Sequence, residues 1–387
     1  MDSNIDKFDD LRPINDSEVS SVIRELLTDR GFQNAVKYIN PGLPWEAFSA
    51  AMSSFTSKYE FQSKIIAPIV WGIAQKTSTS ITASGWDKYE GNEPHTFISN
   101  HRDIILDAGL LNILRHSRGL ETTEIAIGDN LFVYPWIEKL VKLNKSFVVR
   151  RNVSVRQMLE VSKHLSEYIH YTILDKHQSV WIAQREGRAK NADDRTQESL
   201  LKMLALTPDR NCPIDSLKSL NIIPLAISYE YDPCDYLKAQ EFQLKRDNPS
   251  YKKTQANDLK NMETGLLGFK GKIHFRFGRQ INPFLENISD CIERQDVFSK
   301  LAGAIDTEIH YNYEIYPVNY IAYDIHYQTE RFCNKYTLEE KEKFFSYMDS
   351  QIEKIQIEKK DIDFLKSKIT EMYSNILKNY LIAHNEY

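Results

Sequence analysis

Short apolar runs alternate with longer helical segments between Thr96 and Phe277. The apolar runs are TFIS, EIAIG, SFVVR, SVWIA, NIIPLAIS and KIHFRF, and the segments between them, such as SVRQMLEVSKHLSEYIHYTIL, have helical periodicity. Such an alternation is typical of strands joined by crossover helices. The sequence therefore predicts an α/β fold with a largely parallel central sheet flanked by helices.

The segments on either side of this region are predicted to be helical. Near the start, Asp16 and Ser17 can cap the run EVSSVIRELL, whose apolar side chains fall on one face. The chain ends in two further helical stretches, KEKFFSYMDSQIEKIQ and DFLKSKITEMYSNILKNYLI. We expect three parts: a helical N-terminal segment (1–85), an α/β domain (86–288) and a helical C-terminal segment (289–387).

Composition and charge limit the class of protein. A hydrophobic content of 42% and a charged content of 27% are those of a soluble globular chain, and a net charge of -5 gives no general attraction to nucleic acid. The apolar run IIAPIVWGIA is too short to cross a membrane. The acidic start is not a signal peptide, and the four cysteines lack metal-site spacing. We expect a cytoplasmic protein whose membrane contact, if it has one, is peripheral.

The stretch FISNHRDIILD contains the letters HRD, with which the catalytic loop of a protein kinase begins. A kinase also needs an Asn five residues after that Asp, where this chain has Ala108, and it needs DFG and glycine-rich motifs that are absent. The chain has no GxSxG and no GxGxxG either. Phosphoryl transfer, serine hydrolysis and dinucleotide binding are therefore excluded, and no permanently bound cofactor is expected.

His101 follows a predicted strand, and Asp107 lies near the start of the next predicted helix. An imidazole held in one tautomer by a carboxylate can take a proton from an alcohol that attacks a carbonyl. The alternative is a histidine that caps a helix or packs in the core. Later strands deliver cations to the same edge of the sheet, where α/β proteins bind ligands. These are Arg150, Arg151 and Arg188, which suit a phosphate.

Four stretches, taken in order, resemble the glycerolipid acyltransferase family, whose members acylate glycerol 3-phosphate and lysophosphatidate. They are NHRDIILD, GDNLF followed by SFVVRR, QREGRAK, and IIPLAISYE. The likeness extends from Phe97 to Glu230. It implies a glycerol-3-phosphate acyltransferase-like fold and an enzyme of membrane-lipid synthesis.

The resemblance also implies a role for each matching residue. His101 would be the general base, and Asp107 would orient it. The acceptor would be held by Arg150, Arg151 and Arg188 on its phosphate and by Glu186 and Gly187 in its pocket. The acyl group would come directly from acyl-CoA or an acyl carrier protein as co-substrate, without an acyl-enzyme, and would pass to a hydroxyl of glycerol 3-phosphate or a lysophospholipid. The protein would contact the inner surface of the membrane peripherally.

The chain departs from the family pattern at two places. Five residues separate His101 from Asp107, where the family has four, so Asp103 stays an alternative partner; we prefer Asp107 because an acid suits the first turn of a helix. Arg188 comes one residue early, which leaves Ala189 at the family's arginine position. Two alternatives remain open: an acyltransferase for an aminolipid acceptor, and an inactive lipid- or acyl-carrier-binding protein of the same fold.

Overall fold

The computed structural model describes residues 7–88, 93–151, 153–206, 213–288 and 296–387. The described strands form a seven-stranded sheet in the order β1-β7-β6-β2-β5-β3-β4. From β6 to β4 all neighbouring strands are parallel, β7 is antiparallel to β6, and β1 is parallel to β7. The strands are β1 (Ser78–Ser84), β2 (Thr96–Ser99), β3 (Glu124–Gly128), β4 (Ser146–Val149), β5 (Val180–Ala183), β6 (Ile222–Tyr229) and β7 (Gly271–Phe277). The predicted α/β class with a largely parallel sheet is confirmed.

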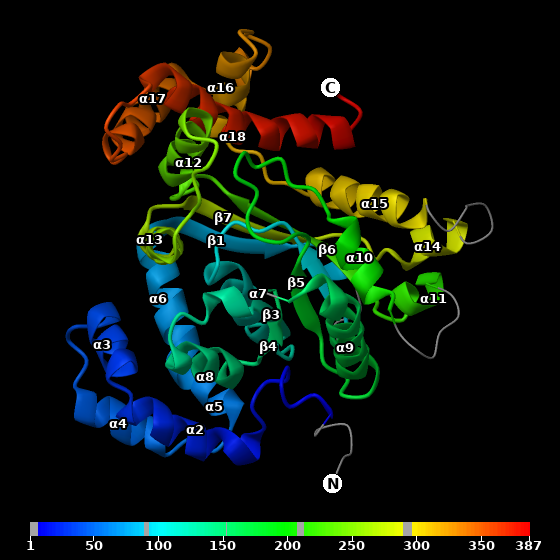
Figure 1. The fold of residues 1–387 in the computed structure, drawn as a ribbon. Coiled ribbons are helices and arrows are strands. Elements are labelled where there is room, and N and C mark those ends of the chain that lie inside the picture. Colours follow the sequence, from blue (N-terminus) through cyan, green and yellow to red (C-terminus); the bar gives the residue numbers. More distant parts are fainter. Residues whose placement is uncertain (1–6, 89–92, 152, 207–212, 289–295) are drawn as a thin grey trace.

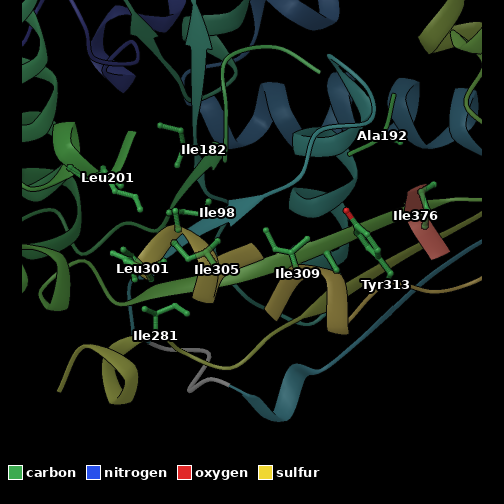
Figure 2. Packing of buried hydrophobic residues seen from close by; sticks show 14 of the residues in the cluster. Ile98, Ile182, Ala192, Leu201, Ile281, Leu301, Ile305, Ile309, Tyr313 and Ile376 are labelled. Atoms are coloured by element: carbon green, nitrogen blue, oxygen red, sulfur yellow. The ribbon is translucent and has the colours of Figure 1, made fainter. Parts of the chain in front are cut away.

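Helices cover both faces of the sheet because successive side chains of a buried strand point to opposite sides. In β2, Phe97 packs into a cluster with α6 (Ala67–Thr77) and α7 (Leu106–His116). Ile98 packs into the opposite cluster, with α9 (Val155–Leu174) and α15 (Val297–Tyr311). Figure 2 shows Ile98 and Ile182 of the neighbouring strand β5 near Leu301 and Ile305 of α15. The central strands are therefore buried on both faces.

The remaining helices are spread along the chain, and Figure 1 shows the first of them in blue and the last in orange and red. The N-terminal helices form their own apolar cluster, which also takes in Leu143 of α8. The N-terminal helices of this cluster are α2 (Asp16–Thr28), α3 (Arg30–Ile39), α4 (Trp45–Ser53) and α5 (Lys58–Phe61), and α8 spans Pro135–Leu143. The others are α10 (Glu198–Leu204), α11 (Pro213–Lys218), α12 (Asp235–Asp247), α13 (Gln255–Leu267), α14 (Asn282–Ile288), α16 (Pro317–His326), α17 (Leu338–Glu353) and α18 (Ile362–Ala383).

Strand β1 corrects one expectation. Residues 1–85 are predicted to form a helical segment, but Ser78–Ser84 pairs with β7 along the edge of the sheet. Its sequence, STSITAS, has no apolar run, and all of its side chains are exposed or half-buried. An edge strand needs little apolar surface, so apolar periodicity did not reveal it. The three-part division of the chain stays a prediction.

Two further expectations concern membranes and metals. No helix in the described ranges combines the length and the apolar character that crossing a bilayer demands. Within the same ranges, no three His, Cys, Asp or Glu side chains gather as metal ligands would. Cys234 and Cys333 are free thiols, whereas Cys212 and Cys291 lie outside the described residues.

Candidate active site

The loop that follows β2 carries His101 out of the sheet at the carboxyl edge of the parallel strands. Asn100, at its start, is locked to the neighbouring strand β6: its side-chain amide donates to the carbonyl of Ile227 at 2.8 Å and its side-chain oxygen accepts from the Ile227 N–H at 2.8 Å. Both bonds are buried. These two hydrogen bonds to β6 fix the point from which His101 projects.

His101 and Asp107 are in contact. The Nδ1 atom of His101 lies 2.8 Å from Oδ2 of Asp107, which is in the first turn of α7. The same oxygen accepts the backbone N–H groups of Arg102 at 2.6 Å and Asp103 at 3.0 Å. The hydroxyl of Tyr229 donates to the other oxygen, Oδ1, at 3.1 Å. These partners satisfy a fully buried carboxylate, which would otherwise be costly.

The surroundings of His101 leave its other nitrogen available. Because a carboxylate accepts at Nδ1, the imidazole proton belongs there and Nε2 carries the lone pair. In the described part of the chain, Nε2 has no hydrogen-bond partner, and the His101 side chain keeps 13% of its surface exposed. Trp181 lies edge-on to the ring, with centroids 5.8 Å apart, and its Nε1 donates to Ser99 at 3.0 Å. The ring is held from one side and open at Nε2.

Asp103, the alternative partner, has a different position. Its Oδ1 accepts the N–H groups of Ile105 at 2.9 Å and Leu106 at 2.7 Å, where α7 begins. Burial and the nearby Asp107 raise the pKa of Asp103. The structure therefore joins His101 to Asp107 across the longer gap and leaves Asp103 to hold the first turn of the helix.

Arg102 links this loop to a segment beyond β5. Its guanidinium forms a buried ion pair with Asp194 at 2.7 Å, and the hydroxyl of Tyr313 also donates to Asp194, at 2.7 Å. Arg102, Asp194 and Tyr229 are not among the site residues predicted from the sequence. Tyr229 could have been found, because it is the last residue of a buried strand and so reaches the same edge as His101. No sequence motif marks Asp194.

The structure brings together Arg151 and Glu186, two of the predicted acceptor residues. Arg151 Nη1 lies 2.7 Å from Glu186 Oε1, and the Arg151 N–H donates to Asp129 at 3.1 Å. Glu186 is followed by Gly187, whose φ of +66° is easy for glycine and strained for other residues. The segments after β4 and β5 therefore meet through an ion pair.

The other two arginines have separate partners. Arg150 faces Asp10 at 3.7 Å and borders a surface groove of about 490 Å³. Arg188 donates to Cys234 Sγ at 3.4 Å and to Asn261 Oδ1 at 3.3 Å. Among the residues that the structure describes, no group is a shared partner of Arg150, Arg151 and Arg188.

Comparisons with known proteins give little. No family model and no curated protein matches the chain. Among solved structures, the chain is similar to the 1-acyl-sn-glycerophosphate (LPA) acyltransferase PlsC from Thermotoga maritima, with a TM-score of 0.37 and 8% identity, over 74% of this chain and 91% of that one. A likeness this weak supports no argument about function.

Proposed function

We propose that this chain is an O-acyltransferase, which moves a fatty acyl group from an acyl thioester to a hydroxyl of glycerol 3-phosphate or a lysophospholipid. One observation carries the proposal: a buried Asp107 lies 2.8 Å from Nδ1 of a partly exposed His101, where the parallel strands end. That is the arrangement that a general base for an alcohol requires.

The proposed reaction needs no cofactor and no acyl-enzyme. Nε2 of His101 takes the proton of the acceptor hydroxyl while the oxygen of that hydroxyl attacks the thioester carbonyl. The carbon–sulfur bond then breaks, and the leaving thiolate takes that proton from the imidazolium. Asp107 stabilises the imidazolium between the two steps. The products are an ester and the free thiol of coenzyme A or the acyl carrier protein.

The acceptor's phosphate would bind to the arginines at the same edge. Arg151 is the first candidate, because its partner Glu186 is mostly exposed and a phosphate could take its place. A guanidinium can hold two phosphate oxygens at once. Arg150, Arg188 and Gly187 belong to the same proposal, as does a peripheral contact with the inner membrane surface, from which a lysolipid would come.

The test is thiol release from acyl-CoA and from acyl carrier protein, with glycerol 3-phosphate, lysophosphatidate and an ornithine aminolipid as acceptors. We expect turnover with a phosphorylated acceptor, and a loss of about a hundredfold to ten-thousandfold in His101→Ala, because general-base catalysis contributes about that much. His164→Ala, which alters a surface histidine, is the matched control and should run at the parent rate.

Two results would count against the proposal. If His101→Ala keeps the parent rate, the mechanism is wrong. If no acceptor works with either donor, although both bind, the chain is better explained as a binding protein. Turnover with the aminolipid alone would keep acyl transfer and replace the acceptor.

A further inference from the structure

We propose that Tyr229 is a positioning residue for the His101–Asp107 pair: it fixes the Asp107 carboxylate so that Oδ2 faces the imidazole. The assignment rests on the proposed function, since it gives Tyr229 a part in that reaction. The hydrogen bond from Tyr229 to Asp107 exists whether or not the chain transfers acyl groups, so it can be tested without any turnover.

First, the two oxygens of Asp107 have different hydrogen-bond partners. Oδ2 accepts from His101 Nδ1 and from the N–H groups of Arg102 and Asp103. Oδ1 accepts from the Tyr229 hydroxyl at 3.1 Å. A carboxylate can turn about its Cβ–Cγ bond, and a donor at Oδ1 opposes that turn. Among the described residues, Tyr229 supplies the one side-chain hydroxyl that does so.

The second step is the rigidity of Tyr229. It ends strand β6 and pairs with Ile273 of β7, so its backbone is held within the sheet. Its side chain is buried, and this burial, with Asp107 next to it, raises the pKa of the hydroxyl well above the usual value. The hydroxyl therefore stays protonated at all physiological pH values and can serve Asp107 as a donor.

The third step concerns the other charges around the loop that carries the pair. The loop itself contributes Arg102, which is paired with Asp194, and Asp103. The surrounding segments contribute the charged groups Asp232, Arg188 and Lys270. A change confined to the Tyr229 hydroxyl leaves all of these in place. A shift in the titration of His101 would then report the lost donor.

The experiment follows the imidazole of His101 by NMR in the full chain, with Tyr229→Phe against the parent. Without the phenol, more negative charge stays on the oxygen that faces His101, and the imidazolium is favoured. We expect the His101 titration to move up by roughly 0.3 to 1 pH unit. In acyl transfer, kcat should fall roughly tenfold to a hundredfold at unchanged KM, because the base is less well aimed.

The matched control is Tyr231→Phe, which removes a hydroxyl from a buried tyrosine two residues later. The ring of Tyr231 packs on Phe269 and Tyr347. Loss of the Tyr231 hydroxyl should leave the pH at which His101 titrates unchanged. If Tyr229→Phe fails to fold, 3-fluorotyrosine at position 229 serves instead: a more acidic phenol donates more strongly, and the titration should then move down.

The outcomes separate the two proposals. A folded Tyr229→Phe whose His101 titrates as in the parent, with or without a loss of stability, overturns the positioning role. An unmoved titration with 3-fluorotyrosine overturns it too. A shifted titration in a protein that transfers no acyl group upholds the contact and defeats the proposed function.

Discussion

Two histidine–aspartate pairs of similar length lie in different surroundings. His101 Nδ1 is 2.8 Å from Asp107, and His164 Nε2 is 3.0 Å from Asp10. The Asp107 side chain is 0% exposed, whereas that of Asp10 is 44% exposed. Distance alone would not tell the two pairs apart.

The difference lies in what else holds each carboxylate. Asp107 accepts hydrogen bonds from two backbone N–H groups of the loop before α7 and from the hydroxyl of Tyr229 at the end of β6. Asp10 is shared with Arg150 at 3.7 Å, beside an open groove. Interactions are stronger where water is excluded, and exposed ion pairs contribute about 0–1 kcal/mol. Fixed donors and burial therefore mark the pair that can orient a base.

Asp107 is the residue at which we expect a substitution to lower the rate most. Asp107→Asn should lower acyl transfer by about a hundredfold to ten-thousandfold, because an amide does not hold the imidazole in the required tautomer. Asp10→Asn should stay within about a factor of two of the parent, as expected for an exposed pair. Initial rates of thiol release measure both. Equal losses in the two variants would show that the surroundings do not matter.

The next effect concerns stability. Arg102→Met leaves Asp194 as a buried charge without its cation, which should cost about 3–5 kcal/mol of unfolding free energy. Arg150→Met removes an exposed partner of Asp10 and should cost about 0–1 kcal/mol. Urea denaturation measures both.

A double variant provides the control for this prediction. Arg102→Met with Asp194→Leu removes both charges and should recover most of the loss, because an apolar pair can replace a buried ion pair. If Arg102→Met lowers the free energy of unfolding no more than Arg150→Met does, burial does not determine how much an ion pair contributes to stability.

The sequence predicted the sheet where burial leaves a pattern. The six apolar runs became strands β2 to β7. Strands β2 and β6 are buried along their whole length and are therefore apolar for most of it, whereas β7 alternates buried apolar residues with more exposed polar ones. Strand β1 was missed because it is a polar edge. The same rule of strand ends that located His101 would have located Tyr229, but it could not decide between Asp103 and Asp107, since both acids lie close to the start of one helix.

The arginines show what one-dimensional reasoning cannot supply. Arg150 and Arg151 are adjacent in sequence, and successive residues at a strand end point to opposite sides. Arg150 faces Asp10, and Arg151 faces Glu186. The buried pair of Arg102 with Asp194 joins two loops that are far apart in the chain, with no spacing rule to connect them. Such contacts are decided by tertiary packing.

Asp103 separates the effect of burial from that of contact with the imidazole, because it is nearly as buried as Asp107 but accepts its hydrogen bonds at the start of α7. Asp103→Asn keeps an acceptor for the N–H groups at the start of α7, so the rate of acyl transfer should stay within about twofold of the parent. Asp103→Ala removes that acceptor and should lower the free energy of unfolding by about 1 kcal/mol. Burial raises the pKa of Asp103, so its contribution to stability falls as the pH rises above 3.8. Asp103→Asn lacks this fall, and urea denaturation from pH 4 to pH 7 should show the variant gaining on the parent. A rate loss as large as that of Asp107→Asn would instead make burial, and not contact with the imidazole, the property that matters.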